Sequence, residues 1–327
     1  MGAITPSAVR LVYMGTAEFA VPTLQRLATE GFSLVTVVTQ PDRPSGRGQS
    51  VKASPVKRKA MELQLNVQQP SSLKNDDIRG YFENLQMDCI VVVAYGKILP
   101  SWLIGLPKYG VMNLHGSLLP RYRGAAPIQW AMANGDSETG VCTMQIDEGL
   151  DTGPVYLCEK TAIPPEESIQ ELSERLSILG SDLVVRTLHG IVSETLRATP
   201  QDDSRASLAP ILRKSDGYVD WQFPAQKIHN RVRAFNPWPG AVTRFRGETL
   251  KILKSKVGQQ IVGSAVNRSV GSIAVAKGSV TVECGDGSQL ALVEVQLPAR
   301  KPMSGSDFVN GMRVQSGERL EREDGQV

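Results

Sequence analysis

Short apolar runs alternate with amphipathic segments through the first half of the chain. Five runs have the length of strands: residues 10–14, 34–39, 88–94, 111–115 and 142–146. Four segments between them have helical periodicity: residues 21–29, 55–63, 78–85 and 127–133. The run 89–93 is apolar throughout, which is typical of a strand buried on both faces. This alternation predicts right-handed βαβ crossovers and a Rossmann-like α/β fold, with a parallel sheet whose functional groups lie at the carboxyl ends of the strands.

The pattern changes in the second half. Residues 169–188 carry leucine and isoleucine at three- and four-residue spacing behind the capping-box pattern Ser168-Ile-Gln-Glu171, so we expect a long helix there. Residues 193–207 are polar and resemble a linker. Beyond them, short β-like runs separated by turn residues predict a small OB-like β-barrel. We therefore expect a catalytic domain at 1–190, a linker at 191–207 and a barrel domain at 208–327.

Composition narrows the class of protein. A length of 327 residues fits about two domains, and 41% hydrophobic with 21% charged residues argues against disorder along the whole chain. The formal net charge of +3 excludes a histone-like polycation. Four cysteines without a CxxC pair make a disulfide scaffold or a structural zinc site unexpected, and they fit a reducing cytoplasm. With no apolar run near ~20 residues and no secretory leader pattern, we expect no membrane association.

Candidate chemistry is concentrated between residues 113 and 153. Asn113 and His115 lie two apart on a predicted strand, so both project from one face. A loop after the strand at 142–146 carries Asp151, which reaches His115 at the carboxyl edge if the two strands are neighbours. An amide can donate to a developing oxyanion, an imidazole can transfer protons, and a carboxylate can orient that imidazole. The set suits acyl transfer to an amine without a metal or an enzyme nucleophile. A structural histidine with turn-forming Asn and Asp remains the alternative.

The first βα junction, around Gly15, has one glycine where the dinucleotide fingerprint has three, which disfavours a nucleotide-dependent dehydrogenase.

The order of the motifs says more than their spacing. The stretch resembles the folate-dependent formyltransferases that use 10-formyltetrahydrofolate, through Asn113-Leu-His115, Ser117-Leu-Leu-Pro120, Arg123-Gly-Ala-Ala-Pro127 and Asp147…Asp151-Thr-Gly153. Supporting stretches are Met14-Gly-Thr16, Thr39-Gln-Pro-Asp-Arg-Pro44 with Gly46-Arg-Gly48, Val93-Ala-Tyr-Gly96 and Arg233-Ala-Phe-Asn-Pro-Trp-Pro-Gly240. The resemblance covers about residues 10 to 312. Tyr122 stands where a tryptophan is frequent in the family.

The resemblance implies roles for individual residues. Asn113 would hold the tetrahedral oxyanion, His115 would polarise the formyl oxygen and assist proton transfer, and Asp151 would orient His115. The implied folate pocket consists of Val93, Ala94, Tyr95 and Gly96, of Ser117, Leu118, Leu119 and Pro120, and of the backbone of Asp147, Glu148 and Gly149. The co-substrate would be 10-formyltetrahydrofolate, with tetrahydrofolate as product and no metal ion.

Two regions of the nearly neutral chain are basic. Residues 40–60 carry six basic side chains and residues 211–256 carry ten, while residues 135–174 hold ten acidic side chains and one lysine. One basic segment alone is usually a solvated face, but two favour a polyanionic partner. The loop Pro41–Ser50, in the first of these basic regions, lies where family members that formylate methionyl-tRNA have an insertion contacting tRNA. We therefore expect initiator methionyl-tRNA as acceptor, in translation initiation, with a monomeric enzyme. The tRNA contacts would come from Arg43, Arg47, Lys52, Arg213, Lys214 and Arg233.

Other functions compete with this one. Within the family, the acceptor would be an amino sugar nucleotide or glycinamide ribonucleotide. The ribonucleotide enzymes are typically single domains, whereas the sugar-nucleotide enzymes share a similar second domain. In a different class, the chain would be a non-catalytic RNA-binding module, against which the intact set of Asn113, His115 and Asp151 argues.

Overall fold

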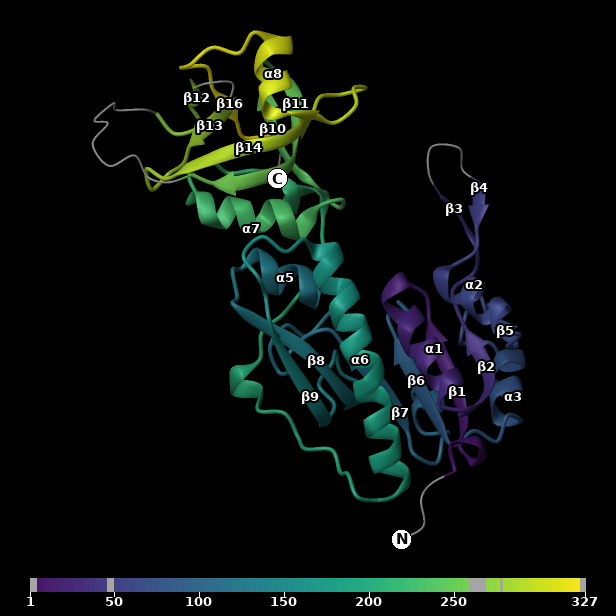
Figure 1. The fold of residues 1–327 in the computed structure, drawn as a ribbon. Coiled ribbons are helices and arrows are strands. Elements are labelled where there is room, and N and C mark those ends of the chain that lie inside the picture. Colours follow the sequence, from purple (N-terminus) through teal and green to yellow (C-terminus); the bar gives the residue numbers. More distant parts are fainter. Residues whose placement is uncertain (1–4, 46–49, 259–268, 277–278, 324–327) are drawn as a thin grey trace. The chain divides into compact units, whose positions relative to one another are not determined.

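The chain forms two compact units (Figure 1). The computed structural model describes residues 5–45, 50–258, 269–276 and 279–323. The first unit comprises Met1–Pro127, Glu138–Ala162 and Gln170–Pro210. The second unit comprises Ile128–Ser137, Ile163–Ile169 and Ile211–Val327. Two short stretches that precede residue 170 thus group with the second unit.

A seven-stranded sheet forms the centre of the first unit, in the order β5-β2-β1-β6-β7-β8-β9. Its strands are β1 (Arg10–Gly15), β2 (Ser33–Val38), β5 (Val67–Gln68), β6 (Cys89–Val93), β7 (Val111–His115), β8 (Glu138–Gln145) and β9 (Val155–Ala162). The strands from β5 to β7 are parallel. This arrangement confirms the predicted Rossmann-like α/β fold, because helices connect the parallel strands. A separate antiparallel pair joins β3 (Arg43–Ser45) to β4 (Ser50–Lys52).

Helices cover both faces of this sheet. They are α1 (Val21–Thr29), α2 (Pro55–Glu62), α3 (Asp76–Glu83), α4 (Ser101–Ile104) and α6 (Ile169–Val192). The helix α5 (Pro127–Ala133) belongs, apart from its first residue, to the second unit. On one face, Val12 and Val92 belong to a buried cluster with Phe82 of α3 and Leu103 of α4. Burial of each such side chain contributes roughly 1.5–3 kcal/mol. On the other face α1 and α6 lie side by side (Figure 1), linked by an ion pair of 3.1 Å between Arg26 and Asp182.

The two last strands of the sheet depart from the prediction. β8 was predicted as part of a parallel sheet, but it runs antiparallel to β7 and to β9. The prediction assumed that each strand reached through a helical segment runs parallel. β9 was not predicted at all, because this edge strand alternates half-buried and exposed residues and offers no continuous apolar run. The two-residue β5 and the four-residue α4 were also missed, being too short for a periodic signal.

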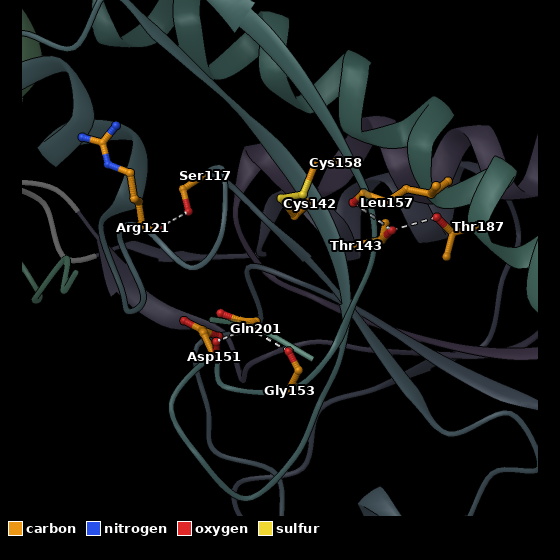
Figure 2. Close-up of a disulfide and its surroundings, with 10 residues drawn as sticks. All are labelled: Ser117, Arg121, Cys142, Thr143, Asp151, Gly153, Leu157, Cys158, Thr187 and Gln201. Atoms are coloured by element: carbon orange, nitrogen blue, oxygen red, sulfur yellow. Dashed lines mark hydrogen bonds between the residues drawn. A yellow bond between two sulfur atoms is a disulfide. The ribbon is translucent and has the colours of Figure 1, made fainter. Parts of the chain in front are cut away.

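One disulfide lies in this part of the sheet. Cys142 of β8 and Cys158 of β9 are direct cross-strand partners, and their sulfur atoms are bonded (Figure 2). Cys142 is fully buried, whereas Cys158 is exposed on the edge strand. Four cysteines without a CxxC pair do not predict this bond, because the pairing depends on β9, and the bond differs from the free thiols expected in a reducing compartment. The other two cysteines, Cys89 and Cys284, are free and buried.

An antiparallel sheet dominates the second unit, in the order β12-β13-β14-β11-β10-β16, with β15 paired to β14. The strands are β10 (Ala241–Phe245), β11 (Glu248–Val257), β12 (Ile273–Ala276), β13 (Ser279–Glu283), β14 (Gln289–Gln296), β15 (Met303–Ser304) and β16 (Leu320–Glu321). An isolated bridge between Ser272 and Arg319 brings the start of β12 to the segment entering β16. The sheet thus curls on itself, which confirms the predicted OB-like fold.

Two helices pack against the core of the second unit. α7 (Ala225–Phe235) contributes Ile228 and Val232, and α8 (Gly305–Met312) contributes Phe308, to a buried cluster with the strands. Phe308 and Phe245 meet edge-on with ring centroids 5.1 Å apart. The remaining short helices of the chain are 3-10 turns at Pro6–Ala8, Glu18–Ala20, Asp203–Arg205 and Lys214–Gly217. Among the residues described, no helix is long and apolar enough to cross a membrane.

Candidate active site

The candidate site is built at the carboxyl end of β7. Asn113 and His115 are two residues apart on this strand and share one face of it. Asn113 is half-buried, and its amide makes no hydrogen bond within the described part of the chain. An amide on a rigid strand with a free donor is suited to bind an oxygen of a ligand.

Both ring nitrogens of His115 face protein groups. The Nε2 atom lies 2.9 Å from the carbonyl oxygen of Tyr122, and the Nδ1 atom lies 3.6 Å from Oδ2 of Asp151. A carbonyl oxygen only accepts, so Nε2 carries a hydrogen and donates it. In the neutral imidazole the lone pair is then on Nδ1, directed toward the carboxylate. The space between Nδ1 and Asp151 is therefore where one further proton would be shared. At 5% exposure, the ring of His115 is largely shielded from water.

Asp151 reaches His115 by a route that differs from the predicted one. Because β7 and β8 are antiparallel, the end of β8 lies beside the start of β7, with Gln145 opposite Met112. The loop after β8 must turn back to bring Asp151 to the other end of β7. The assumption that the two strands are parallel is therefore wrong, although they are neighbours and Asp151 does reach His115 as predicted. Oδ2 of Asp151 also accepts a hydrogen bond of 2.8 Å from the backbone N–H of Gly124.

The returning loop is held by short internal contacts. The Asp147 carboxylate accepts hydrogen bonds from the backbone N–H of Gly149 and from the hydroxyl of Thr152. A Cβ on Gly153 would lie 1.9 Å from the carbonyl oxygen of Gln145, so only glycine permits this approach. Glu148 and Gly149 are exposed, and because the N–H of Gly149 is bonded to Asp147, the backbone groups left for a ligand are those of Glu148 and the carbonyl of Gly149. Asp151 has a φ of +53°, a left-handed conformation that costs a non-glycine residue about 1–3 kcal/mol.

A second turn follows β6, at the predicted folate residues 93–96. Ala94 and Gly96 are exposed and have positive φ angles of 44° and 79°. The backbone oxygen of Tyr95 accepts hydrogen bonds from Thr16 (3.0 Å) and Gln40 (2.8 Å), which tie the turn to the ends of β1 and β2. Polar groups from three neighbouring strands thus meet at one edge of the sheet, as the fold predicts.

The side chains of Val93 and Tyr95 do not line this turn. Val93 is fully buried, and the Tyr95 ring packs in the apolar cluster beside α3 and α4. Burial raises the pKa of Tyr95 to about 12, and its hydroxyl has no hydrogen-bond partner among the described groups. These two residues offer a ligand only their backbone.

The predicted folate residues 117–120 connect β7 to the loop that contacts His115. The fully buried hydroxyl of Ser117 donates a 2.6 Å hydrogen bond to the carbonyl of Arg121, and the Leu119–Pro120 peptide is cis. Leu118, Leu119 and Pro120 are half-buried. The hydrogen bond of Ser117 shapes the turn that presents the Tyr122 carbonyl to His115.

The predicted tRNA contacts have different environments. Arg43 and Lys52 are exposed and are direct partners across the β3–β4 pair. Arg47 lies outside the described residues. In the second unit Arg213 and Lys214 are exposed.

Arg233 is more enclosed than the other predicted tRNA contacts. Its guanidinium donates to the carbonyls of Pro164 and Glu167 and to Oδ1 of Asn230. Burial lowers the pKa of Arg233, while the nearby Glu166 and Glu167 act in the opposite direction. These bonds give Arg233 a structural role within its own unit.

Three contributors to the site were not singled out from the sequence as site residues. Tyr122 supplies the carbonyl for His115, and Gly124 supplies the N–H for Asp151. Gln201, in the predicted linker, contacts the Asp151 loop. The first two act through backbone groups, which sequence does not reveal, and Gln201 is distant along the chain. Among the described residues no group of three or more His, Cys, Asp or Glu is arranged to hold a metal ion.

Both halves of the chain match models of known protein families. The model for the formyl transferase domain matches residues 9–188, and that for the formyl transferase C-terminal domain matches residues 211–313. The methionyl-tRNA formyltransferase of Solibacter usitatus is 46% identical over 95% of this chain and 98% of its own. That of Geobacter metallireducens is 45% identical, with the same coverage of each.

A solved structure supports the fold. WlaRD, a sugar 3N-formyl transferase solved with dTDP and 5-N-formyl-THF, superimposes with a TM-score of 0.66 at 19% identity, over 90% of this chain and 99% of that one. The match of both domain models, together with relatives of this identity over nearly their whole length, shows that the chain belongs to the formyltransferase family.

Proposed function

We propose that the protein transfers the formyl group of 10-formyltetrahydrofolate to the α-amino group of initiator methionyl-tRNA, for initiation of protein synthesis. The observation that carries the proposal is the pairing of His115 with Asp151 beside the free amide of Asn113, in a chain whose methionyl-tRNA formyltransferase relatives match 95% of its length. The metal-independent reaction needs a donor for the developing oxyanion and a base for the amine proton.

Asn113 would stabilise the oxygen on which charge develops. Its amide N–H groups are unengaged within the described residues, so no existing hydrogen bond is lost when they bind a ligand. Removing one such donor typically costs about 10²–10³ in kcat. The exposed backbone at Ala94 and Gly96, and at Glu148 and Gly149, provides polar groups for the pterin of the folate.

His115 and Asp151 would act together as the acceptor of the amine proton. The bond from Nε2 to Tyr122 fixes the tautomer, so the basic nitrogen is Nδ1, on the side of Asp151. Once a proton lies between Nδ1 and Oδ2, the carboxylate stabilises the imidazolium. The N–H of Gly124 keeps Oδ2 at this position.

We also propose that Arg43 and Lys52 contact the tRNA, together with Arg47, which lies between them in the sequence. Two cations directly opposite each other on an antiparallel pair repel, which destabilises the hairpin by itself. A phosphate backbone would relieve this repulsion. The exposed Arg213 and Lys214 are further candidates in the second unit. Arg233, which is already bonded to three protein groups, would act mainly by supporting its unit.

The experiment that tests the function offers one folate donor to four acceptors in parallel. We expect formylation of methionyl-tRNA, and none of uncharged tRNA, an amino sugar nucleotide or glycinamide ribonucleotide. Formylation of the amino sugar nucleotide alone would favour the alternative that the chain is a sugar-nucleotide formyltransferase. Binding of tRNA without any formylation would favour the RNA-binding module.

The proposed function also suggests where the protein acts and in which oligomeric state. Charged tRNA and reduced folate are used where translation takes place, so we propose a cytoplasmic enzyme that acts as a monomer without a membrane. Sedimentation with and without tRNA tests the monomer, since a mass near 71 kDa, twice 35.5 kDa, would contradict it.

A further inference from the structure

The predicted linker, residues 191–207, is hydrogen-bonded to the loop 147–153, which carries Asp151. Thr199 exchanges two backbone hydrogen bonds of 2.8 Å with Val155, directly after that loop. Ser207 accepts at its hydroxyl from the N–H of Tyr122, and its carbonyl accepts from the N–H of Arg123. The segment from residue 199 to 209 is thus bonded to both stretches that meet at His115.

Gln201 is central to these contacts. Its Nε2 donates to the backbone oxygen of Asp151 at 2.8 Å and to that of Gly153 at 2.7 Å (Figure 2). Both amide hydrogens are therefore used on one loop, on either side of Thr152. The two bonds fix the direction of the Asp151 carbonyl and with it the backbone from which the carboxylate projects.

Arg123 determines which way the Gln201 amide faces. The Nε and Nη2 atoms of Arg123 donate to Oε1 of Gln201 at 3.1 and 2.8 Å, and Nη2 also donates to Asp203. Because a guanidinium only donates, Oε1 must face Arg123, so Nε2 must face the loop. Arg123 is 7% exposed, which keeps this arrangement largely away from water.

The conformation of Asp151 explains why such support matters. Its left-handed backbone is unfavourable for a non-glycine residue and persists only if the surroundings hold it. The gap of 3.6 Å between Oδ2 and Nδ1 leaves little tolerance, because a displacement of about 1 Å can cost up to 10²-fold in rate. Gln201 supplies two of the bonds that hold this backbone.

We propose that Gln201 is a positioning residue for the Asp151 carboxylate, so that the linker segment completes the active site of the first unit. The proposal rests on the proposed function, because it assigns Gln201 an effect on formyl transfer through Asp151. Gln201 would act through the backbone of Asp151 and Gly153, to which its amide is bonded.

The test uses the full-length enzyme with Gln201→Met, which retains the volume but cannot donate, and Gln201→Glu as a second variant. We expect both to lower kcat about tenfold, with the KM values for methionyl-tRNA and 10-formyltetrahydrofolate changed less than twofold. Asp202→Ala is the matched control, since its exposed carboxylate caps only the neighbouring turn at Ser204. We expect it to retain wild-type kcat.

A double-mutant cycle separates positioning from general support of the fold. In an Asp151→Asn background, Gln201→Met should lower kcat by less than twofold, because the group it positions is already lost. A full tenfold loss in that background, or wild-type kcat for both Gln201 variants, would overturn the proposal. If Asp151→Asn alone retained activity, the assignment of Asp151 would fail first, so the two failures are distinguishable.

Discussion

The loop at residues 147–153 and the basic pair β3–β4 are both polar segments at the end of strands, yet their side chains are used in opposite ways. In the first, Asp147 is bonded within the loop to Thr152, and Asp151 and Gly153 are bonded to Gly124 and Gln201 outside it. In the second, Arg43 and Lys52 are exposed and face each other with like charge. One segment is satisfied by the fold, and the other is suited to an anionic partner from outside.

This difference separates two requirements of the proposed reaction. Proton transfer needs atoms at fixed distances, so the residues around His115 are bonded from several directions. Contact with a nucleic-acid backbone depends on charge and tolerates variation in geometry. Variants in the two segments should therefore affect different kinetic constants.

The largest effect is expected at His115 and Asp151. His115→Ala or Asp151→Asn should lower kcat by about 10²–10⁴-fold, because general acid–base catalysis is lost. Single-turnover formylation of methionyl-tRNA measures this directly. Circular dichroism controls for folding, and a loss of less than fivefold in both variants would refute the assigned roles.

Gly153→Ala should come next. The added Cβ would collide with the carbonyl of Gln145 and displace the loop that carries Asp151. We expect a fall in kcat of about 10-fold or more and a loss of about 1–3 kcal/mol in the free energy of unfolding. Gly80→Ala, at which an added Cβ meets no atom within 4 Å and φ is not positive, is the matched control for exchanging glycine for alanine in the same unit.

The basic pair should affect binding of tRNA. Arg43→Ala and Lys52→Ala should each raise the KM for methionyl-tRNA and reduce the slope of log affinity against log salt by about 1. The KM for 10-formyltetrahydrofolate and the single-turnover rate at saturation should not change. Lys74→Ala, an exposed lysine elsewhere in the same unit, is the matched control. An unchanged salt slope would show that the two cations are only a solvated face.

The smallest effect concerns pH and the second unit. Burial lowers the pKa of His229, whose Nδ1 contacts Ser255 and whose Nε2 lies 3.3 Å from the Pro165 carbonyl. The unfolded chain therefore binds a proton more readily than the folded one. Stability should fall as the pH decreases through about 6.5, the ordinary value for histidine, and level off below the lowered pKa.

Thermal unfolding of the wild type and of His229→Gln between pH 7.5 and 5 tests this. The wild type should lose more stability over that range than the variant, because the variant has no proton to bind at this position. Parallel curves for the two proteins would show that His229 does not contribute to the pH dependence.

The sequence was most informative where residues act through periodicity or order. The limits of α1 and β7 were predicted as they occur, because apolar residues repeat there with the period of a buried element. The direction of β8 was not, since antiparallel and parallel strands carry the same pattern. The pairing of Cys142 with Cys158 depended on β9 and was lost with it.

Site residues followed the same rule. Asn113, His115 and Asp151 were found from their order, and the structure brings His115 and Asp151 together. The carbonyl of Tyr122 and the N–H of Gly124 were missed because every residue has such groups. Gln201 lies in a segment whose polar composition predicts only a linker. Its partners lie about 50 and 80 residues away along the chain, so the local sequence does not indicate its contacts.

The short strand β16 has a consequence for aggregation. Leu320 is almost fully buried, and β16 covers β10 while the adjoining Arg319 bridges to Ser272 beside β12. Without these residues both outer strands of the curled sheet would expose unpaired backbone groups. Open strand edges of this kind recruit strands from other molecules. A few residues close to the carboxyl end thus help to keep the second unit from polymerising.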